Sequence, residues 1–268
     1  MNGKDLGRLL EAVRKERPMV HHITNYVTVN DCANITMFIG AAPVMAHSKD
    51  EVAEMVCMAG ALVLNIGTLD AGQVEAMLIA GKRANELKIP IVLDPVGAGA
   101  TPLRTSSAKK LIRTLKISVL KGNAGEVATL AGEEATVRGV DSMGVKRDTT
   151  EIAADFAAAL GTTVAITGAV DVVSDGKRVV SVINGHPLMG AFSGSGCMAA
   201  SLCGAFAAVS SDHVKSTVAA LVAFGIAGEN AARKSKGPYS FRAALFDAVA
   251  ALTPAELAKK ARIEVVKE

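Results

Sequence analysis

A glycine-rich stretch, Gly190-Ala-Phe-Ser-Gly-Ser-Gly-Cys197, runs directly into an apolar segment that extends from Met198 to Ala208. The glycines at positions 194 and 196 can adopt backbone angles that other residues avoid, and they let a ligand approach the main chain. A helix that begins there presents its first unpaired N–H groups to an anion such as a phosphate. The stretch is therefore a candidate anion site, although a glycine-rich connection to a core helix has the same composition.

Two side-chain types in this stretch carry chemical expectations of their own. Ser193 or Ser195 is expected to cap the helix, because a serine oxygen accepts a hydrogen bond from the first free amides. Cys197 lies in the first turn, where the positive field of the helix end lowers the pKa of a thiol and favours the thiolate. The sequence thus places a reactive sulfur beside a candidate anion site.

Two carboxylates follow apolar runs farther upstream. Asp94 ends the run that starts at Pro90, and Glu126 falls in the first turn of a predicted helix. Mg²⁺ takes oxygen ligands, keeps several waters, and is commonly held by one or two carboxylates beside phosphates. Singly, Asp94 can be a turn former before Pro95, and Glu126 a residue favoured by the helix dipole. Together with the anion site, the two carboxylates indicate a metal–phosphate site, in which each carboxylate contacts the metal ion directly or through water.

Other polar residues end or interrupt apolar runs. Lys121 and Thr167 end two strand-like runs and supply a cation and a hydroxyl that suit nucleotide phosphates. Each also has a purely structural interpretation: Lys121 as a solvated charge at the edge of the sheet, and Thr167 as a β-branched strand residue. His21 and His22 form a possible metal-binding pair, but neighbours on a strand face opposite sides. We expect one structural histidine and one that lines a pocket.

The elements that must position these residues follow from the spacing of apolar side chains. Helices are expected at 4–16, 31–39, 71–87, 106–115 and 151–160, with further helices starting near 48 and 122, over most of 197–252, and from 253. Strands are expected at 19–23, 43–45, 61–65, 90–94, 117–121 and 163–167, and a loop at 138–148. Two valine pairs flank Asp175-Gly176, which predicts a β-hairpin within 171–183.

Alternating strands and helices predict one α/β domain spanning residues 1–268. Its central sheet is mostly parallel, with helices on both faces and the β-hairpin at the edge. In such sheets ligands bind beyond the carboxyl ends of the strands. Asp94, Lys121 and Thr167 all follow apolar runs, so this edge is where the chemistry is expected.

The composition excludes several classes of function. Of the 268 residues half are hydrophobic, Trp is absent, and only two are Tyr, which leaves little for stacking on single-stranded nucleic acid. The net charge of +3 is scattered, so no nucleic-acid partner is expected. The cysteines, at 32, 57, 197 and 203, form no Cys-x-x-Cys pair, and no signal peptide is evident, which favours a reduced cytoplasmic protein. The apolar runs at 197–209 and 218–228 fall short of the ~20 residues of a membrane span.

Taken together, the motifs resemble those of a known family. They are His21-x-Ile-Thr-Asn25, Ala42-Pro-Val-Met45, Asn65-Ile-Gly-Thr68, Asp94-Pro-Val-Gly-Ala-Gly99, Gly122-Asn-x-x-Glu126, Ile166-Thr-Gly168 and Gly194-Ser-Gly-Cys197, in this order. This series resembles the hydroxyethylthiazole kinases of thiamine salvage, which have a ribokinase-like three-layer fold. The resemblance implies phosphorylation of the hydroxyl of 4-methyl-5-(2-hydroxyethyl)thiazole, with ATP as donor and Mg²⁺ as cofactor.

The resemblance also implies roles for individual residues. It assigns Asp94 and Glu126 to Mg²⁺; Lys121, Asn123, Thr167 and Gly168 to ATP; Asn25, Met45, Gly67 and Gly194 to the thiazole; and Gly194, Ser195, Gly196 and Cys197 to catalysis. It implies a homotrimer whose active sites lie between subunits, with Met45 from one subunit and the catalytic loop from its neighbour. In the wider ribokinase group an aspartate base usually stands where this chain has Cys197. Phe192-Ser193 departs from the valine-threonine that is common in the family.

Three alternatives stay open at this stage. Cys197 can serve as the nucleophile of a hydrolase if His186 is its general base, although this leaves the two carboxylates without a role. The fold can instead serve a non-catalytic ligand-binding or regulatory protein, against which the acidic pair and anion loop argue. A third alternative keeps the kinase chemistry but changes the alcohol, for example to hydroxymethylpyrimidine. Release of ADP in the presence of different alcohols separates the three.

Overall fold

The chain alternates strands and helices over the residues that the computed structural model describes: 1–133, 135–138, 141–145 and 147–267, with the backbone alone for 135–138 and 141–145. The helices are α1 (Gly3–Glu16), α2 (Val29–Ile39), α3 (Val52–Val56), α4 (Ala71–Glu86), α5 (Pro102–Thr114), α6 (Ala124–Ala131), α7 (Thr149–Leu160), the 3₁₀ helix η1 (Pro187–Gly190), α8 (Ser195–Ala207), α9 (His213–Ala232), α10 (Pro238–Ala251) and α11 (Pro254–Lys260). The strands are β1 (Met19–Ile23), β2 (Ala42–Val44), β3 (Ala61–Asn65), β4 (Ile91–Asp94), β5 (Val119–Asn123), β6 (Ala135–Arg138), β7 (Asp141–Val145), β8 (Thr163–Thr167), β9 (Asp171–Ser174), β10 (Val179–Val182) and β11 (Ile263–Lys267).

Among the described residues, nine strands form one sheet in the order β11-β10-β9-β8-β5-β4-β3-β1-β2. From β2 to β8 every neighbouring pair is parallel, whereas β8–β9, β9–β10 and β10–β11 are antiparallel. Strands β6 and β7 form a separate antiparallel pair. The predicted mostly parallel sheet is confirmed.

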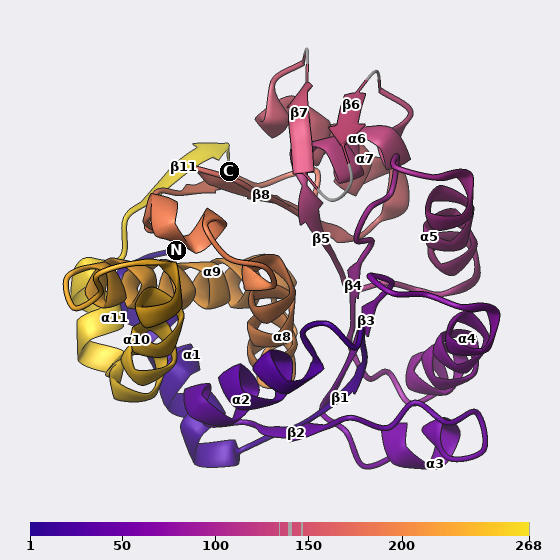
Figure 1. Cartoon of the computed structure of the whole chain (residues 1–268), viewed down its shortest axis with the longest axis horizontal. Coiled ribbons are helices and arrows are strands. Elements are labelled where there is room, and N and C mark those ends of the chain that lie inside the picture. The colour runs from indigo at the N-terminus through magenta and orange to yellow at the C-terminus, as the bar shows by residue number, and fades with distance from the viewer. Residues whose placement is uncertain (134, 139–140, 146, 268) are drawn as a thin grey trace.

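Helices cover both faces of the sheet, and Figure 1 shows α3, α4 and α5 on one side and α8 to α11 on the other. The position of β3 in the interior of the sheet explains why its residues 61–64 are all apolar. Val63 packs into the core shared with α8 and α9, while Leu62 and Leu64 pack into the core shared with α4 to α7. A strand buried on both faces has no polar side to display.

Several predicted elements are confirmed closely. Strands β3 and β8 have the predicted bounds, and β9 and β10 form the predicted hairpin. At its turn Gly176 has φ +89°, a left-handed conformation that favours glycine. The hairpin is not the edge of the sheet, however, because β11 pairs with the outer side of β10.

Other predictions are wrong in their bounds. Helix α5 begins at Pro102 rather than 106, because Thr101 caps it by accepting from Arg104 N. The capping box expected at 48–51 gives only a turn, and α3 begins at Val52. The predicted loop 138–148 contains β7; positions 139, 140 and 146 lie outside the described residues.

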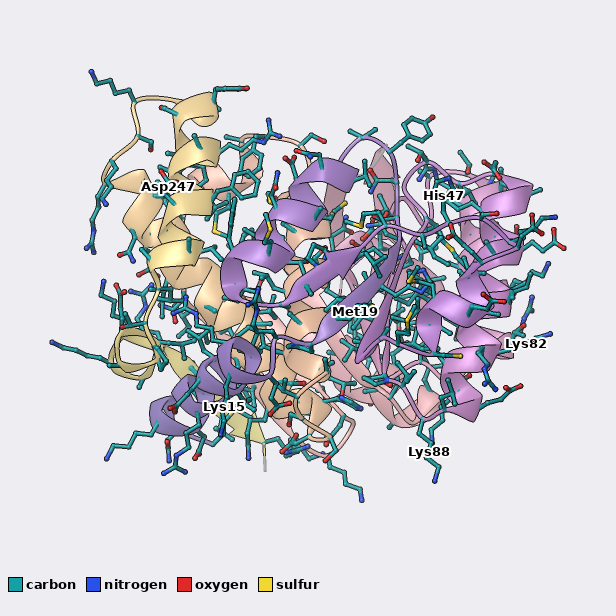
Figure 2. The ribbon with its side chains drawn as sticks, turned by 90° about the horizontal axis from the view of Figure 1, so that it is seen from below. Lys15, Met19, His47, Lys82, Lys88 and Asp247 are labelled. Atoms are coloured by element: carbon teal, nitrogen blue, oxygen red, sulfur yellow. The ribbon has the colours of Figure 1, made fainter. Side chains whose placement is uncertain are left out.

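The first helix of the chain packs against the last one. Helix α1 lies along α11, and the approach is so close that a Cβ at Gly7 would lie 2.6 Å from the carbonyl oxygen of Pro254. Leu6 and Leu10 of α1 are fully buried there and in the adjoining core. Figure 2 shows Asp247 on α10 and Lys82 on α4 on opposite sides of the molecule.

Candidate active site

The carboxyl ends of neighbouring parallel strands gather polar side chains at one edge of the sheet. Asn65, which ends β3, is in register with Asp94, which ends β4. Asn123, which ends β5, is in register with Thr167, which ends β8. Lys121 lies two residues before the end of β5. Strand pairing therefore brings together polar residues that are up to about 100 positions apart, as expected for a doubly covered parallel sheet.

Asp94 and Lys121 form a buried ion pair at the centre of this edge. The Lys121 Nζ lies 3.6 Å from Asp94 Oδ2 and donates to the carbonyl oxygen of Gly196 at 3.1 Å. Asn65 Nδ2 donates to the same Asp94 oxygen at 2.9 Å, whereas Asp94 Oδ1 is buried without a hydrogen-bond partner. Burial raises the pKa of Asp94 despite the opposing attraction of Lys121. Burial opposes the charge of Lys121, but Asp94 and Glu126 outweigh it and raise the pKa of this amine.

Glu126 is held by the backbone at the start of α6. Its Oε2 accepts from Asn123 N at 2.8 Å while Asn123 Oδ1 accepts from Glu126 N at 2.9 Å, which is a capping box. Its Oε1 accepts from Gly97 N at 2.7 Å, in the loop after β4. Burial, and then the charge of Asp94, raise the pKa of Glu126 to about 7. The two carboxylates thus influence each other's charge, as a shared cation site requires.

Cys197 lies beside this acidic group in the first turn of α8. Its Sγ accepts from Asn65 Nδ2 at 3.3 Å and from Asn25 Nδ2 at 3.4 Å. Burial, and then the charge of Asp94, raise the pKa of the thiol above its ordinary value. Desolvation and the nearby carboxylate thus oppose the thiolate that the field of the helix end was expected to favour.

The glycine loop enters α8 without a serine cap. The residue at the cap position is Gly194, with φ +103° and no side-chain cap, so the expectation for Ser193 or Ser195 is wrong. A Cβ at Gly194 would lie 2.6 Å from Thr28 Cγ2 just before α2, so glycine is required both for the angle and for this approach. The first helical bond runs from Met198 N to Gly194 O, so the amides of residues 195–197 have no acceptor within the helix itself.

Two of the residues predicted for the thiazole, Asn25 and Gly67, lie together beside Cys197. Asn25 is buried and contacts Cys197 within one chain. Gly67 joins it, since Gly67 N donates to Asn65 Oδ1 and a Cβ there would lie 2.9 Å from Asn25 Cβ. Met45 follows β2 and is half-buried. Asn25 therefore lies beside the catalytic loop of its own chain.

The residues predicted for the nucleotide continue along the edge beyond Glu126. Thr167 Oγ1 donates to the carbonyl oxygen of Gly122 at 3.3 Å, and Gly168 N donates to Asp171 Oδ1 at 2.9 Å. Asp171 keeps part of its surface in solvent, yet burial raises its pKa to about 7. This carboxyl at the start of β9 was not singled out from the sequence, where it looks like the polar first residue of a hairpin.

In the described part of the chain, neither His21 nor His22 forms a hydrogen bond with a residue of this cluster. His21 and His22 are both buried, with His21 Nε2 2.7 Å from Ala46 O and His22 Nδ1 3.0 Å from Val20 O. Burial lowers the pKa of His22 to about 4. The expected pocket-lining histidine is therefore wrong, and over the described residues no group of three or more His, Cys, Asp or Glu suits a metal ion. His186 accepts from Leu188 N at the start of η1, so its position gives no support to a Cys197–His186 hydrolase.

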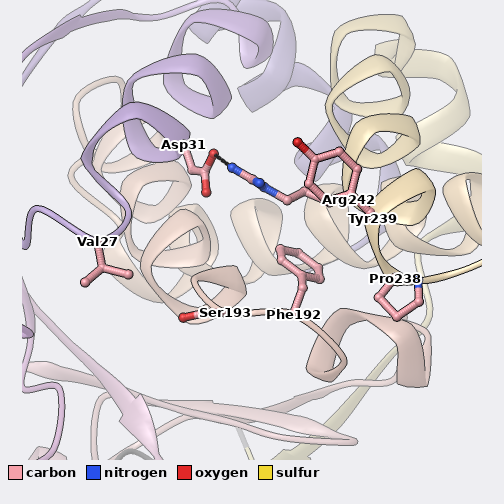
Figure 3. Close-up of a pocket in the computed structure, with 7 residues that line it drawn as sticks. All are labelled: Val27, Asp31, Phe192, Ser193, Pro238, Tyr239 and Arg242. Carbon is pink, nitrogen blue, oxygen red and sulfur yellow. Dashed lines mark hydrogen bonds and ion pairs between the residues drawn. The ribbon is translucent and has the colours of Figure 1, made fainter.

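A cavity of about 320 Å³ opens beside the glycine loop, between the starts of α2 and α10 (Figure 3). Asp31, which is buried, forms an ion pair with Arg242 across it, and the Arg242 guanidinium lies 5.9 Å from the centre of the Tyr239 ring. The lining residues are Val27, Asp31, Phe192, Ser193, Pro238, Tyr239 and Arg242. No sequence pattern predicts this cavity, because its wall comes from three segments far apart in the chain.

Besides Asp171, two further site residues were not assigned from the sequence. Asn65 was recognised only as a strand end, yet its amide bonds both Asp94 and Cys197. Arg104, near the start of α5, contacts the loops after β3 and β4 through their carbonyl oxygens. Because those partners are backbone atoms, no pattern of side-chain types marks Arg104 in the sequence.

The fold and this edge define the class of protein. A ribokinase-like superfamily protein from Enterococcus faecalis V583 superposes with a TM-score of 0.63 over 86% of each chain, at 14% sequence identity. An identity this low supports the fold alone, and the fold predicted from the sequence is confirmed. None of the helices in the described part of the chain is both long and apolar enough to cross a membrane.

Closer relatives define the family. The model of the hydroxyethylthiazole kinase family matches residues 10–255. The hydroxyethylthiazole kinase of Methanocella arvoryzae is 63% identical over 98% of this chain and 99% of its own length. A solved structure of hydroxyethylthiazole kinase protein from Pyrococcus horikoshii OT3 has a TM-score of 0.91 at 45% identity and covers 98% of this chain and 99% of its own. The chain belongs to the hydroxyethylthiazole kinase family, as the motifs predicted.

Proposed function

We propose that this chain transfers the terminal phosphoryl group of ATP to the hydroxyl of 4-methyl-5-(2-hydroxyethyl)thiazole. The observation that carries the proposal is one cluster: the ion pair of Asp94 and Lys121 lies directly against the loop at the start of α8, and Asn65 bonds both Asp94 and Cys197. Phosphoryl transfer needs positioning and charge neutralisation more than covalent chemistry. Family membership supplies the alcohol.

The acidic pair fits Mg²⁺. Asp94 Oδ1 is a buried anionic oxygen without a hydrogen-bond partner, which is an unusual state that a cation or its water would relieve. Glu126 has each oxygen oriented by a backbone amide, so its position is fixed before any ion arrives. Asp94 and Glu126 would hold the ion, and the ion when bound would neutralise charge on the phosphates.

The remaining groups act on the reactants. The free amides at the start of α8 donate to the developing negative charge. Cys197, whose sulfur already accepts from Asn25 and Asn65, orients the substrate hydroxyl, and the hydroxyl proton passes to a phosphoryl oxygen. The positive charge of Lys121, which faces both Asp94 and the carbonyl oxygen of Gly196, offsets negative charge at this place. Thr167, Asn123 and Gly168 face the nucleotide; Asn25, Gly67, Gly194 and Met45 face the thiazole.

The test is an ADP-release assay with thiazole, pyrimidine and sugar alcohols. The thiazole alcohol should give the highest kcat/KM, and Glu126→Gln should lose most turnover while staying folded, because Gln preserves the shape but not the charge. Equal turnover of hydroxymethylpyrimidine would contradict the substrate assignment. Near-normal activity of Glu126→Gln at saturating Mg²⁺ would contradict the metal assignment.

The same proposal includes a homotrimer with shared active sites. Tyr26 and Val27, directly after Asn25, and Tyr239 on α10 are 77%, 63% and 81% exposed, which leaves an apolar surface beside the site. A head-to-tail ring would cover this surface and bring Met45 from a neighbouring subunit to the catalytic loop.

A mixing experiment distinguishes active sites that are shared between subunits from active sites that lie within one subunit. Met45→Arg blocks the thiazole half, and Asp94→Asn removes the chemical half, so each homo-oligomer should be inactive. Co-refolded mixtures should regain a fraction of wild-type turnover. Mixed oligomers that are demonstrably formed yet inactive would show that both halves act within one chain.

A further inference from the structure

Arg104 joins two loops of the site through their backbone. It lies in the first turn of α5, and its guanidinium donates to Val96 O at 2.8 Å, Gly67 O at 2.6 Å and Ile66 O at 3.3 Å. The first carbonyl belongs to the loop after β4, and the other two belong to the loop after β3. A planar guanidinium with five N–H donors can hold several fixed acceptors at once, which an ammonium cannot do in the same way.

The peptide group between Val96 and Gly97 is bonded at both of its ends. Its carbonyl accepts from Arg104, and its N–H donates to Glu126 Oε1 at 2.7 Å. Gly97 has φ +78°, and a Cβ there would lie 2.8 Å from Arg104 Cδ, so the side chain lies directly against this peptide. A cation at a carbonyl polarises the peptide and makes its N–H a stronger donor. Arg104 therefore acts on Glu126 through one peptide group.

The peptide group between Ile66 and Gly67 repeats the pattern. Its carbonyl accepts from Arg104, and its N–H donates to Asn65 Oδ1 at 2.9 Å. The amide nitrogen of Asn65 then donates to Asp94 Oδ2 at 2.9 Å. Arg104 is thus connected to both Asp94 and Glu126, each time through a polarised peptide group. Among the described residues, its guanidinium bonds only carbonyl oxygens and neither carboxylate.

We propose that Arg104 is a positioning residue of the kinase reaction, which orients Asp94 and Glu126 through these two peptide groups. The inference rests on the proposed function for its kinetic consequence. Removal of hydrogen bonds one step behind a charged ligand typically costs about 10- to 100-fold in activity. We expect a loss of this size in kcat, because the acidic pair acts on charge that develops during transfer, and a KM for the thiazole alcohol within about threefold of wild type.

The chain contains a matched control. Arg14 at the end of α1 also donates to three carbonyl oxygens, those of Ile39, Val249 and Ala250, at 3.4, 3.5 and 3.2 Å. These carbonyls belong to the last turns of α2 and α10, away from the sheet edge. Arg14→Ala removes the same number of similar bonds but no connection to the acidic pair.

The experiment compares Arg104→Ala, Arg104→Lys and Arg14→Ala. Arg104→Ala should lower kcat by about 10- to 100-fold, Arg104→Lys should recover part of it by keeping the charge, and Arg14→Ala should keep wild-type kcat at a similar or larger loss of thermal stability. If Arg104→Ala fails to fold, Arg104→Lys carries the test. A kcat unchanged in both Arg104 variants, or reduced equally in Arg14→Ala, would overturn the proposal.

A second readout does not depend on activity. In TROSY NMR spectra of the full chain, the amide protons of Gly67 and Gly97 should shift upfield in Arg104→Lys, because the peptide groups that carry them lose part of the polarisation by the guanidinium. The same two resonances should stay in place in Arg14→Ala. Unmoved resonances would overturn the proposed connection even if turnover fell. A wild-type chain without kinase activity would refute the proposed function but leave this spectroscopic test intact.

Discussion

The two ends of α8 use glycine for the same geometric purpose with opposite consequences. Near the first end, a Cβ at Gly196 would lie 3.1 Å from the Lys121 ammonium. Near the other end, a Cβ at Gly204 would lie 2.5 Å from Val63 Cγ2. Both glycines let a neighbour approach the helix backbone, but one neighbour is the movable end of a charged side chain and the other is a β-branched residue of the buried sheet.

The difference separates chemistry from stability within one helix. Cys197 at the first end has polar neighbours, and nearby Asp94 keeps a buried oxygen without a partner. Cys203 at the other end is fully buried in the apolar core, and burial raises its pKa to about 12. Interactions at the first end are incomplete in the free protein, as a site that awaits a ligand requires, whereas those at the other end are complete. Substitutions should therefore affect activity at one end and stability at the other.

The largest effect is expected from Asp94→Asn. It removes the negative charge that faces Lys121 and the metal site, and losing one preorganised electrostatic group typically costs about 10²- to 10³-fold in kcat. Glu126 still balances the Lys121 charge, so the urea midpoint should change little. Turnover above a tenth of wild type would show that the chemistry does not depend on this end of the sheet.

Gly204→Ala should show the reverse behaviour. The new methyl group cannot avoid Val63, whose side chain is fixed in β3, and overpacking of this kind costs about 1–3 kcal/mol in the free energy of unfolding. This exceeds the up to ~1 kcal/mol that Ala gains over Gly in a helix. Urea unfolding should report the loss, while kcat per folded molecule stays at the wild-type value. A selective loss of kcat would break the division between the two ends.

Gly196→Ala sharpens the comparison with the same substitution at the active end. The methyl group displaces the Lys121 ammonium from Gly196 O, which we expect to lower kcat about tenfold, or ~1.4 kcal/mol. Because an ammonium can move aside and Ala favours the helix, the free energy of unfolding should be unchanged or higher. A variant that loses stability as Gly204→Ala does would show that both ends are structural.

The smallest effect is expected from Cys197→Asp. The amides of Asn25 and Asn65 that now donate to sulfur can donate to a carboxylate, and nearby Asp94 would raise its pKa toward that of a proton acceptor. Turnover should stay within about threefold of wild type or rise, since a carboxylate at this position can act as a base, and a positioned base typically contributes roughly 10²- to 10⁴-fold. Cys197→Ala, as the control, should lose part of the activity. A folded but inactive Cys197→Asp would show that this position does not handle the hydroxyl.

Much of the fold was predictable because its signals are local. The strands 61–65 and 163–167 contain the unbroken apolar runs 61–64 and 164–166, and the turn at Asp175-Gly176 needs the left-handed backbone angle that glycine adopts. Strand β11 was missed because Val265 and Val266 are exposed on an edge and give no burial pattern. The start of α5 was missed because the cap at Thr101 precedes a stretch without apolar periodicity.

The site was predictable only where function requires a particular side chain at a strand end. Asp94 and Glu126 follow apolar runs, and the parallel registers bring their elements together. The charge state of Cys197 was not predictable, since it depends on burial and on Asp94, which is distant in the chain. Arg104 was not predictable either, because its partners are carbonyl oxygens that every residue possesses.

The packing of α1 on α11 has a consequence for the order of folding. The apolar side chains of Leu6, Leu10 and Val13 on α1 are fully buried. Helices α2, α8, α9 and α11 all contact α1, and the last of them begins at Pro254, about 250 residues away; contacts with such separation form slowly. The central parallel strands can pair from nearer neighbours, so α1 docks late, after the part of the chain that carries the catalytic groups. We therefore expect the apolar side of the first helix to be covered only in part until α8, α9 and α11 have folded.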